Sequence, residues 1–127
     1  MLIDAHFHTF PVIRGVRLGV EEITSERYGM VRRKSRGLER FLPPGFEYTG
    51  YPIEVAVQYL QWGEIEKAVF FQSYVYGDHT DYYLEHVVPH ANFRALALID
   101  PRKQDAPKLV RHLISQGFVG ILSLIHI

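Results

Sequence analysis

The sequence predicts an α/β fold of the (β/α)8 TIM-barrel type with only about the first four strands present, a truncated barrel. Three observations support this prediction. Apolar strand segments alternate with helical segments, which is typical of a parallel sheet wrapped by helices. The first strand is followed by His-Thr-Phe-Pro and not by the Gly-rich phosphate turn of an open nucleotide-binding sheet. A full barrel takes about 250 residues, so the 127 residues here correspond to about half of one.

The expected elements begin with a short strand at residues 2–7, apolar at first and then alternating. Residues 9–51 are rich in Gly, Pro, Arg and Glu without a sustained period, which predicts a long loop. An apolar helix is expected from Pro52 to Gly63, because Pro suits a first helical position and Gly a helix end. The other expected elements are strands at 67–73, 93–99 and 118–122, alternating with helices from Asp81 towards His90 and from Asp105 to Gln116. The 67–73 strand is almost continuously apolar, as in strands covered on both faces.

One domain is expected for residues 1–127, as the N-terminal half of a barrel. The last six residues, 122–127, carry no turn, helix cap or polar terminus and end the chain within an apolar strand. They also resemble the translated sequencing-adapter read-through of incomplete genes. We therefore expect a non-native tail on an incomplete chain, and we assign His126 no chemical role.

Composition and charge exclude several classes of protein. Lys plus Arg and Asp plus Glu both number 14, which argues against a nucleic-acid or anionic-membrane partner. The chain has no cysteine, so disulfides, thiolate metal sites and cysteine nucleophiles are excluded. Its start lacks the pattern of a signal peptide, and no apolar stretch approaches the ~20 residues of a membrane helix. A cytoplasmic protein with a small-molecule substrate is expected, and a homo-oligomer is left open.

His6 and His8 are the strongest candidates for chemistry. They lie two residues apart on the expected first strand, so both imidazoles point to one face and can bind a single divalent ion. His8 directly precedes the long segment, and active sites of parallel barrels lie at the C-terminal ends of strands. Asp4 shares the parity of the histidines, which predicts a second-shell contact with a histidine nitrogen or a role in holding the strand end.

Other polar residues are weaker candidates. Gln72 and Ser73 end the expected 67–73 strand, and His79 lies in the loop that follows, so all three are candidates for substrate binding. The alternative role of His79 is a solvated loop residue or a helix cap. The basic run at residues 32–36 is interpreted either as a solvated loop surface or as an anion site for a substrate carboxylate.

Five segments together resemble one enzyme family. Residues 2–8 resemble the opening strand of the amidohydrolase superfamily. The segments at 63–72, 76–85, 97–101 and 117–121 are similar, in order and spacing, to its amidohydrolase-related (amidohydrolase 2) family. The resemblance implies a divalent metal, zinc or manganese, held by the first-strand histidines, with further ligands and a catalytic Asp expected beyond residue 127. After Ile121 the chain departs from the family pattern, which favours truncation.

The resemblance implies a metal-dependent hydrolase or decarboxylase (a lyase) that acts on a small carboxylic acid, lactone or amide. The sequence does not decide between these reactions, because the deciding residues are expected outside the chain. Two alternatives stay open. One is a TatD-like or PHP-like metal-dependent phosphoesterase or deoxyribonuclease, which also opens with Asp-x-His-x-His. The other is a non-catalytic fragment of an incomplete gene model, which can neither close a barrel nor assemble its site.

Overall fold

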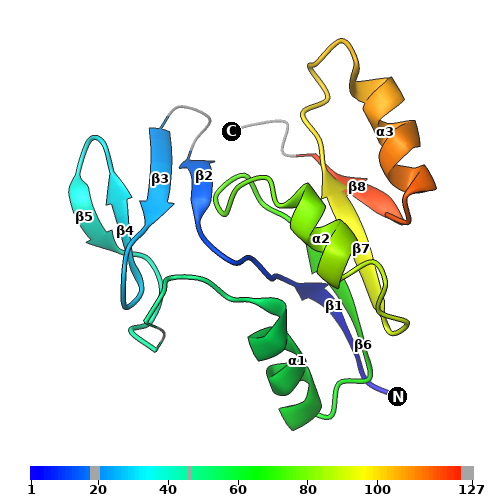
Figure 1. Cartoon of the computed structure of the whole chain (residues 1–127), viewed down its shortest axis with the longest axis horizontal. Helices are drawn as coiled ribbons and strands as arrows, with labels where there is room; N and C mark the ends of the chain where they lie inside the picture. The colour runs from blue at the N-terminus through cyan, green and yellow to red at the C-terminus, as the bar shows by residue number, and fades with distance from the viewer. Residues whose placement is uncertain (18–20, 46, 124–127) are drawn as a thin grey trace.

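The part of the chain that the structure describes contains two four-stranded β-sheets and three helices (Figure 1). The structure is a computed structural model that describes residues 1–17, 21–45 and 47–123. The parallel sheet has the strand order β1-β6-β7-β8, and the antiparallel sheet has the order β2-β3-β4-β5. The parallel strands are β1 (Ile3–Phe7), β6 (Lys67–Phe71), β7 (Phe93–Leu98) and β8 (Gly120–Leu122). The antiparallel strands are β2 (Arg14–Arg17), β3 (Glu21–Ser25), β4 (Met30–Arg33) and β5 (Gly37–Arg40).

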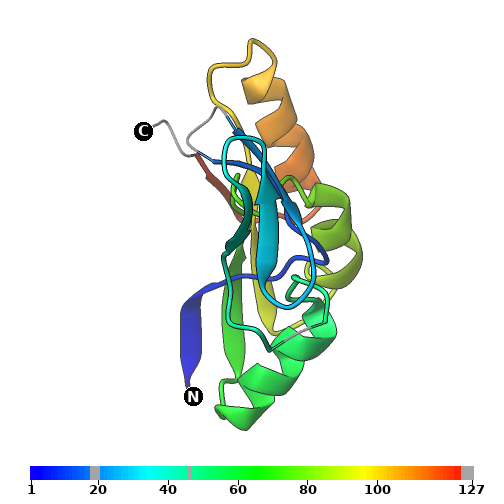
Figure 2. The ribbon, with the colours of Figure 1, turned by 90° about the vertical axis from the view of Figure 1, so that its left-hand side faces the viewer.

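The three helices lie on one side of the parallel sheet (Figure 2). They are α1 (Ile53–Trp62), α2 (Thr80–His86) and α3 (Ala106–Ser115). α1 follows Pro52 and ends before Gly63, and its buried residues recur at helical spacing. The core between helices and sheet contains mainly the buried side chains of Phe70, Tyr83, Val87 and Phe118 with small residues of β6 and β7.

The prediction of a truncated (β/α)8 barrel is wrong. The chain is a small α/β domain with an open four-stranded parallel sheet, in which β1 and β8 occupy opposite edges, and with a second, antiparallel sheet beside it. Repeated strand–helix units are common to open sheets and barrels, because the local pattern does not encode whether the first and last strands pair. The expectation that the 67–73 strand is covered on both faces also fails. Ala68 and Phe70 are buried against the helices, whereas the alternate residues Val69 and Phe71 are only half-buried.

The prediction of a long loop at residues 9–51 is also wrong, because this segment contains the whole antiparallel sheet. The strands have only four or five residues each, and each carries two charged residues. Such short amphipathic strands give a weak periodic signal. Their apolar face becomes evident only when Ile23 and Val31 pack with Phe10 and Ile13, which precede the sheet, in a second buried cluster.

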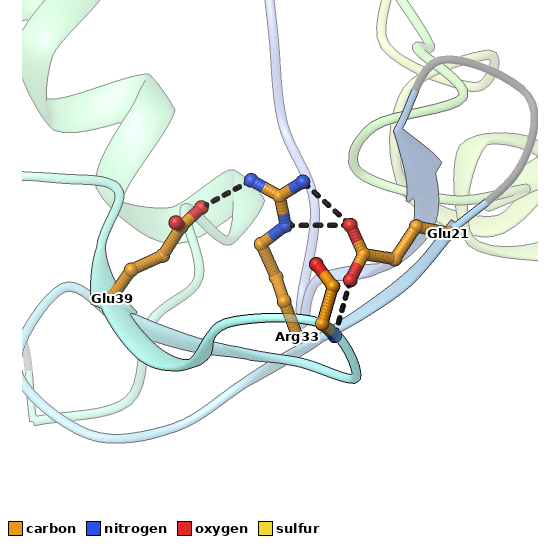
Figure 3. A network of polar contacts seen from close by, with 4 residues as sticks. Glu21, Arg33 and Glu39 are labelled. Carbon is orange, nitrogen blue, oxygen red and sulfur yellow. Dashed lines mark hydrogen bonds and ion pairs between the residues drawn. The ribbon is translucent and has the colours of Figure 1, made fainter.

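Arg33 of the basic run lies at the centre of an ion-pair network in this sheet (Figure 3). Its guanidinium donates to Glu21 at 2.6 Å and to Glu39 at 2.8 Å, and only 7% of its side chain is exposed. The neighbouring Arg32 pairs with Glu26 at 2.7 Å. Arg32 and Arg33 therefore already have carboxylate partners within the chain, which argues against an anion-binding role for these two residues of the run.

The later elements lie close to their expected positions, and each is shorter than expected by a few residues. Of the expected tail at 122–127, Leu122 ends β8 and Ser123 follows it, while residues 124–127, including His126, lie outside the described residues. None of the helices in the described ranges is long and apolar enough to span a membrane.

Replacing Phe70 by Ala is expected to lower the free energy of unfolding by about 3–5 kcal/mol, because the ring is fully buried and the cavity would remain. Phe70 packs against Phe7 and Phe93 at ring-centroid distances of 5.4 and 4.8 Å. The control is Trp62→Ala, which removes a larger ring that is 84% exposed and should change stability by no more than about 0.5 kcal/mol. Urea denaturation of both variants tests this; equal losses would contradict the assigned core.

Acid should weaken the antiparallel sheet through Glu21. Hydrogen bonds from Ser35 and then from Arg33 lower the pKa of Glu21 from 4.5 to about 2. A lowered folded-state pKa favours folding where the carboxyl is ionised. This contribution is therefore complete above about 4.5 and is lost as the pH falls towards about 2. Glu21→Gln should flatten the dependence of unfolding free energy on pH in that window. The exposed neighbour Glu22, changed to Gln, is the control and should leave the dependence nearly unchanged.

Candidate functional site

The two histidines of the Asp-x-His-x-His motif face each other at the C-terminal end of β1. His6 is in the strand, His8 directly follows it, and their Nε2 atoms are 3.1 Å apart. Two nitrogens at this separation, each about 2.0–2.1 Å from one ion, would subtend an angle of about 95–102° at it, between octahedral and tetrahedral geometry. The pair therefore has the spacing of two adjacent ligands of one cation.

A hydrogen bond to the main chain fixes the tautomer of His8. Its Nδ1 lies 2.8 Å from the carbonyl oxygen of Phe71, the last residue of β6. A carbonyl oxygen can only accept, so Nδ1 carries the proton and donates, which leaves the lone pair on Nε2. That lone pair accepts a hydrogen bond from His6 Nε2–H, or else both Nε2 lone pairs face one cation. A backbone carbonyl behind the distal ring nitrogen is the usual support of a metal-binding histidine.

Aromatic rings hold both imidazoles in place. Phe71 stacks on His6 with ring centroids 4.4 Å apart and planes 14° apart. Tyr76 meets His8 edge-on at 5.2 Å and stacks on Phe10 at 4.0 Å. Neither Tyr76 nor Phe71 is among the candidate site residues that the sequence indicates. Only the pairing of β6 with β1 indicates that the residue ending β6 lies beside the histidines.

Burial is the main reason that the pKa of His8 lies below its usual 6.5. The neighbouring His6 also lowers it, whereas the hydrogen bond to Phe71 and the charge of Asp4 act in the opposite direction. The ring is therefore predominantly neutral at neutral pH. Neutral imidazole is the form that binds a metal.

Asp4 does not follow the expected parity. Its Oδ1 accepts a hydrogen bond from the backbone N–H of His6 at 2.8 Å, so this contact is with the main chain and holds the strand end. The pairing of β1 with β6 shifts register between Asp4 and Phe7. Asp4 lies opposite buried Ala68, whereas His6 stacks on Phe71 of the other face. An irregularity in the strand breaks the alternation on which the parity argument depends.

The three candidate substrate residues instead organise the loop between β6 and α2. The buried Gln72 accepts from the backbone N–H of His79 at 2.8 Å and donates to Thr80 at 3.5 Å. Ser73 Oγ accepts from the N–H of Val75 at 3.3 Å. His79 Nε2 donates to the carbonyl of Tyr76 at 3.0 Å. None of these hydrogen bonds connects the three residues to His6 or His8, and their binding of a substrate stays a prediction.

Within residues 1–17, 21–45 and 47–123, no group of three His, Asp or Glu side chains is arranged to hold a metal. In those ranges the pair of His6 and His8 is therefore not joined by a third such side chain. A groove with a volume of about 480 Å³ lies elsewhere, between the antiparallel sheet and the start of α1. None of the six candidate site residues lines it. Its lining includes Glu26, Arg27, Glu47, Tyr48 and Val55.

Comparison with known proteins supports the fold and does not extend to function. No protein-family model matches the chain. No curated protein matches it either. Among solved structures, the chain is similar to an apo crystal structure of ATU3138 from Agrobacterium tumefaciens, with a TM-score of 0.53 and 18% sequence identity. The similarity covers 94% of this chain and 35% of that chain, so this chain spans about a third of its length. The resemblance to the amidohydrolase-related family stays a prediction.

Gly77 permits the close contact between the 72–80 loop and the antiparallel sheet. Its φ is +111°, and a Cβ there would lie 2.2 Å from the carbonyl oxygen of Arg14. Gly77→Ala should therefore destabilise the fold by more than the about 1–2 kcal/mol expected for a left-handed residue alone. Gly37→Ala is the control, because Gly37 has φ +69° but open space around it. Thermal unfolding compares the two; equal losses would contradict the assigned contact.

Proposed function

We propose that the chain carries part of the metal site of a metal-dependent hydrolase or decarboxylase for a small carboxylic acid, lactone or amide. The observation that carries this proposal is the pair of opposed Nε2 atoms 3.1 Å apart, with His8 Nδ1 held by a carbonyl. Two histidines at a strand end are common by chance. A fixed tautomer that turns the free lone pair of His8 towards its neighbour is a much more specific arrangement.

The donor set fits a transition metal. Neutral imidazole nitrogens suit zinc and related ions, with zinc the first candidate and manganese the second. The two histidines would occupy two adjacent coordination positions, and the others would be taken by water, substrate or groups outside the assembled pair. A divalent ion held there would polarise a carbonyl or carboxylate and lower the pKa of water. Two protein ligands alone imply weak binding, so the affinity of this chain is expected to be modest.

The surrounding residues would orient the ligands. Phe71 packs on the ring of His6 and accepts from the ring of His8, so one residue restrains both imidazoles. Tyr76 closes the other side of His8 and has its pKa raised by burial, so its hydroxyl stays protonated at neutral pH. These rings would give an apolar wall beside a planar carboxylate or acyl substrate. A cytoplasmic location is part of the same proposal.

The decisive variant is the double change His6→Ala with His8→Ala. The wild-type chain should bind zinc, and the double variant should lose at least about 90% of that affinity, because both imidazole donors are gone. His112→Ala is the control, since it removes an exposed imidazole on α3, outside the pair. Isothermal titration with zinc and with manganese measures the binding. Equal affinity in the wild type and the double variant would refute the metal site.

Activity distinguishes the reaction classes. Metal-loaded protein should act on carboxylate, lactone or amide substrates, and the double variant should be inactive. Turnover of a phosphodiester without turnover of acyl or carboxylate substrates would replace the proposal with a phosphoesterase. Zinc binding without any turnover would show that the chain holds a metal ligand pair without a complete active site.

A further inference from the structure

The hydroxyl of Tyr83 lies behind the candidate metal ligands and joins the two segments that hold His8. It donates to the carbonyl oxygen of Phe71 at 2.7 Å. The same oxygen accepts the Nδ1 proton of His8 at 2.8 Å, so one carbonyl uses both of its lone pairs. The backbone N–H of Thr9 points to the Tyr83 hydroxyl at a longer distance, 3.5 Å.

These contacts hold His8 from both sides. The Thr9 N–H belongs to the peptide unit that directly follows His8. A contact with this N–H therefore restrains the main chain of His8. The Phe71 carbonyl fixes the orientation of the His8 ring. Tyr83 therefore links the backbone position of His8 to the acceptor of its side chain through a single oxygen atom.

The position of this oxygen is itself rigid. Tyr83 is fully buried in the core on α2, and its backbone takes part in helix hydrogen bonds with His79 and Val87. Burial raises the pKa of Tyr83, so the hydroxyl remains a donor over the physiological pH range. Thr9 is also buried, and its hydroxyl donates to the backbone carbonyl of Tyr51 at 2.8 Å. A buried polar group with satisfied partners defines one geometry more sharply than apolar packing does.

We propose that Tyr83 is a positioning residue that keeps the His8 ring in the Nδ1–H tautomer with Nε2 turned towards His6. Without the hydroxyl, the Phe71 carbonyl loses its second donor and the Thr9 N–H loses its buried acceptor. The carbonyl and the turn after β1 then become free to move relative to each other. The His8 ring would exchange between tautomers, and the lone pair on Nε2 would be available for only part of the time.

This inference rests on the proposed function, because the position of the His8 ring matters for metal binding. The tautomer of His8 can nevertheless be measured without metal. Nitrogen NMR of the imidazoles in metal-free protein, at a pH where the rings are neutral, distinguishes Nδ1–H from Nε2–H. The wild-type His8 should be Nδ1–H, and Tyr83→Phe should shift its signals towards the Nε2–H form. A wild-type His8 with its proton on Nε2 would overturn the proposal, whatever the variant does.

Tyr82→Phe is the matched control. Tyr82 is the neighbouring residue on α2, and its hydroxyl accepts from the backbone N–H of Ile53 at 2.7 Å and also lies near Thr9. The Tyr82 hydroxyl does not hydrogen-bond to the carbonyl of Phe71, whereas that of Tyr83 does, so the comparison isolates that contact. The tautomer of His8 should be unchanged in Tyr82→Phe. Equal tautomer populations in Tyr83→Phe and the wild type would refute the positioning role.

Zinc binding supplies a second measurement. Tyr83→Phe should weaken zinc affinity about tenfold, the lower end for loss of a group that supports a metal ligand, and Tyr82→Phe should not. Unchanged affinity in Tyr83→Phe would overturn the role of Tyr83 while leaving the metal site intact. If the wild-type chain binds no zinc, the proposed function fails, and the tautomer of His8 still decides the role of Tyr83.

Discussion

The pairing of β1 with β6 is the constraint on which the rest of the candidate site depends. β1 has only one neighbour in the parallel sheet, and that neighbour lies about sixty residues later in the chain. The pairing brings the C-terminal ends of both strands together. It places the Phe71 ring against His6 and the Phe71 carbonyl against His8. Packing of Phe7 on Phe70, on the face of the sheet that the helices cover, holds this register.

The loop between β6 and α2 connects this edge of the parallel sheet to the antiparallel sheet. Gln72 closes the loop internally, Tyr76 reaches His8, and Gly77 allows the loop to approach the backbone of Arg14. A backbone hydrogen bond from Arg14 N–H to the Tyr76 carbonyl completes the contact at 2.8 Å. The antiparallel sheet therefore supports the loop between β6 and α2, which packs beside the histidines.

The candidate ligand pair requires fewer structural elements than a complete catalytic centre. It needs only a strand end and one carbonyl, which a single parallel pairing provides. A complete catalytic centre needs more groups than the described residues bring together. The similar solved structure is almost three times as long as the matched part, since the chain covers 35% of it, and at 18% identity that likeness concerns the fold alone.

The sequence by itself determined the order of strands and helices after Pro52 and the histidine pair at the end of β1. Helix caps, helix stops and apolar runs are local signals, so they can be recognised in the sequence without knowledge of the fold. Only the tertiary structure decided that the parallel sheet stays open, that residues 9–51 form a second sheet, and that Asp4 leaves the register of His6. It alone placed the Phe71 carbonyl behind His8. These features arise from pairings between distant segments, and no short stretch of sequence encodes which distant partner it will meet.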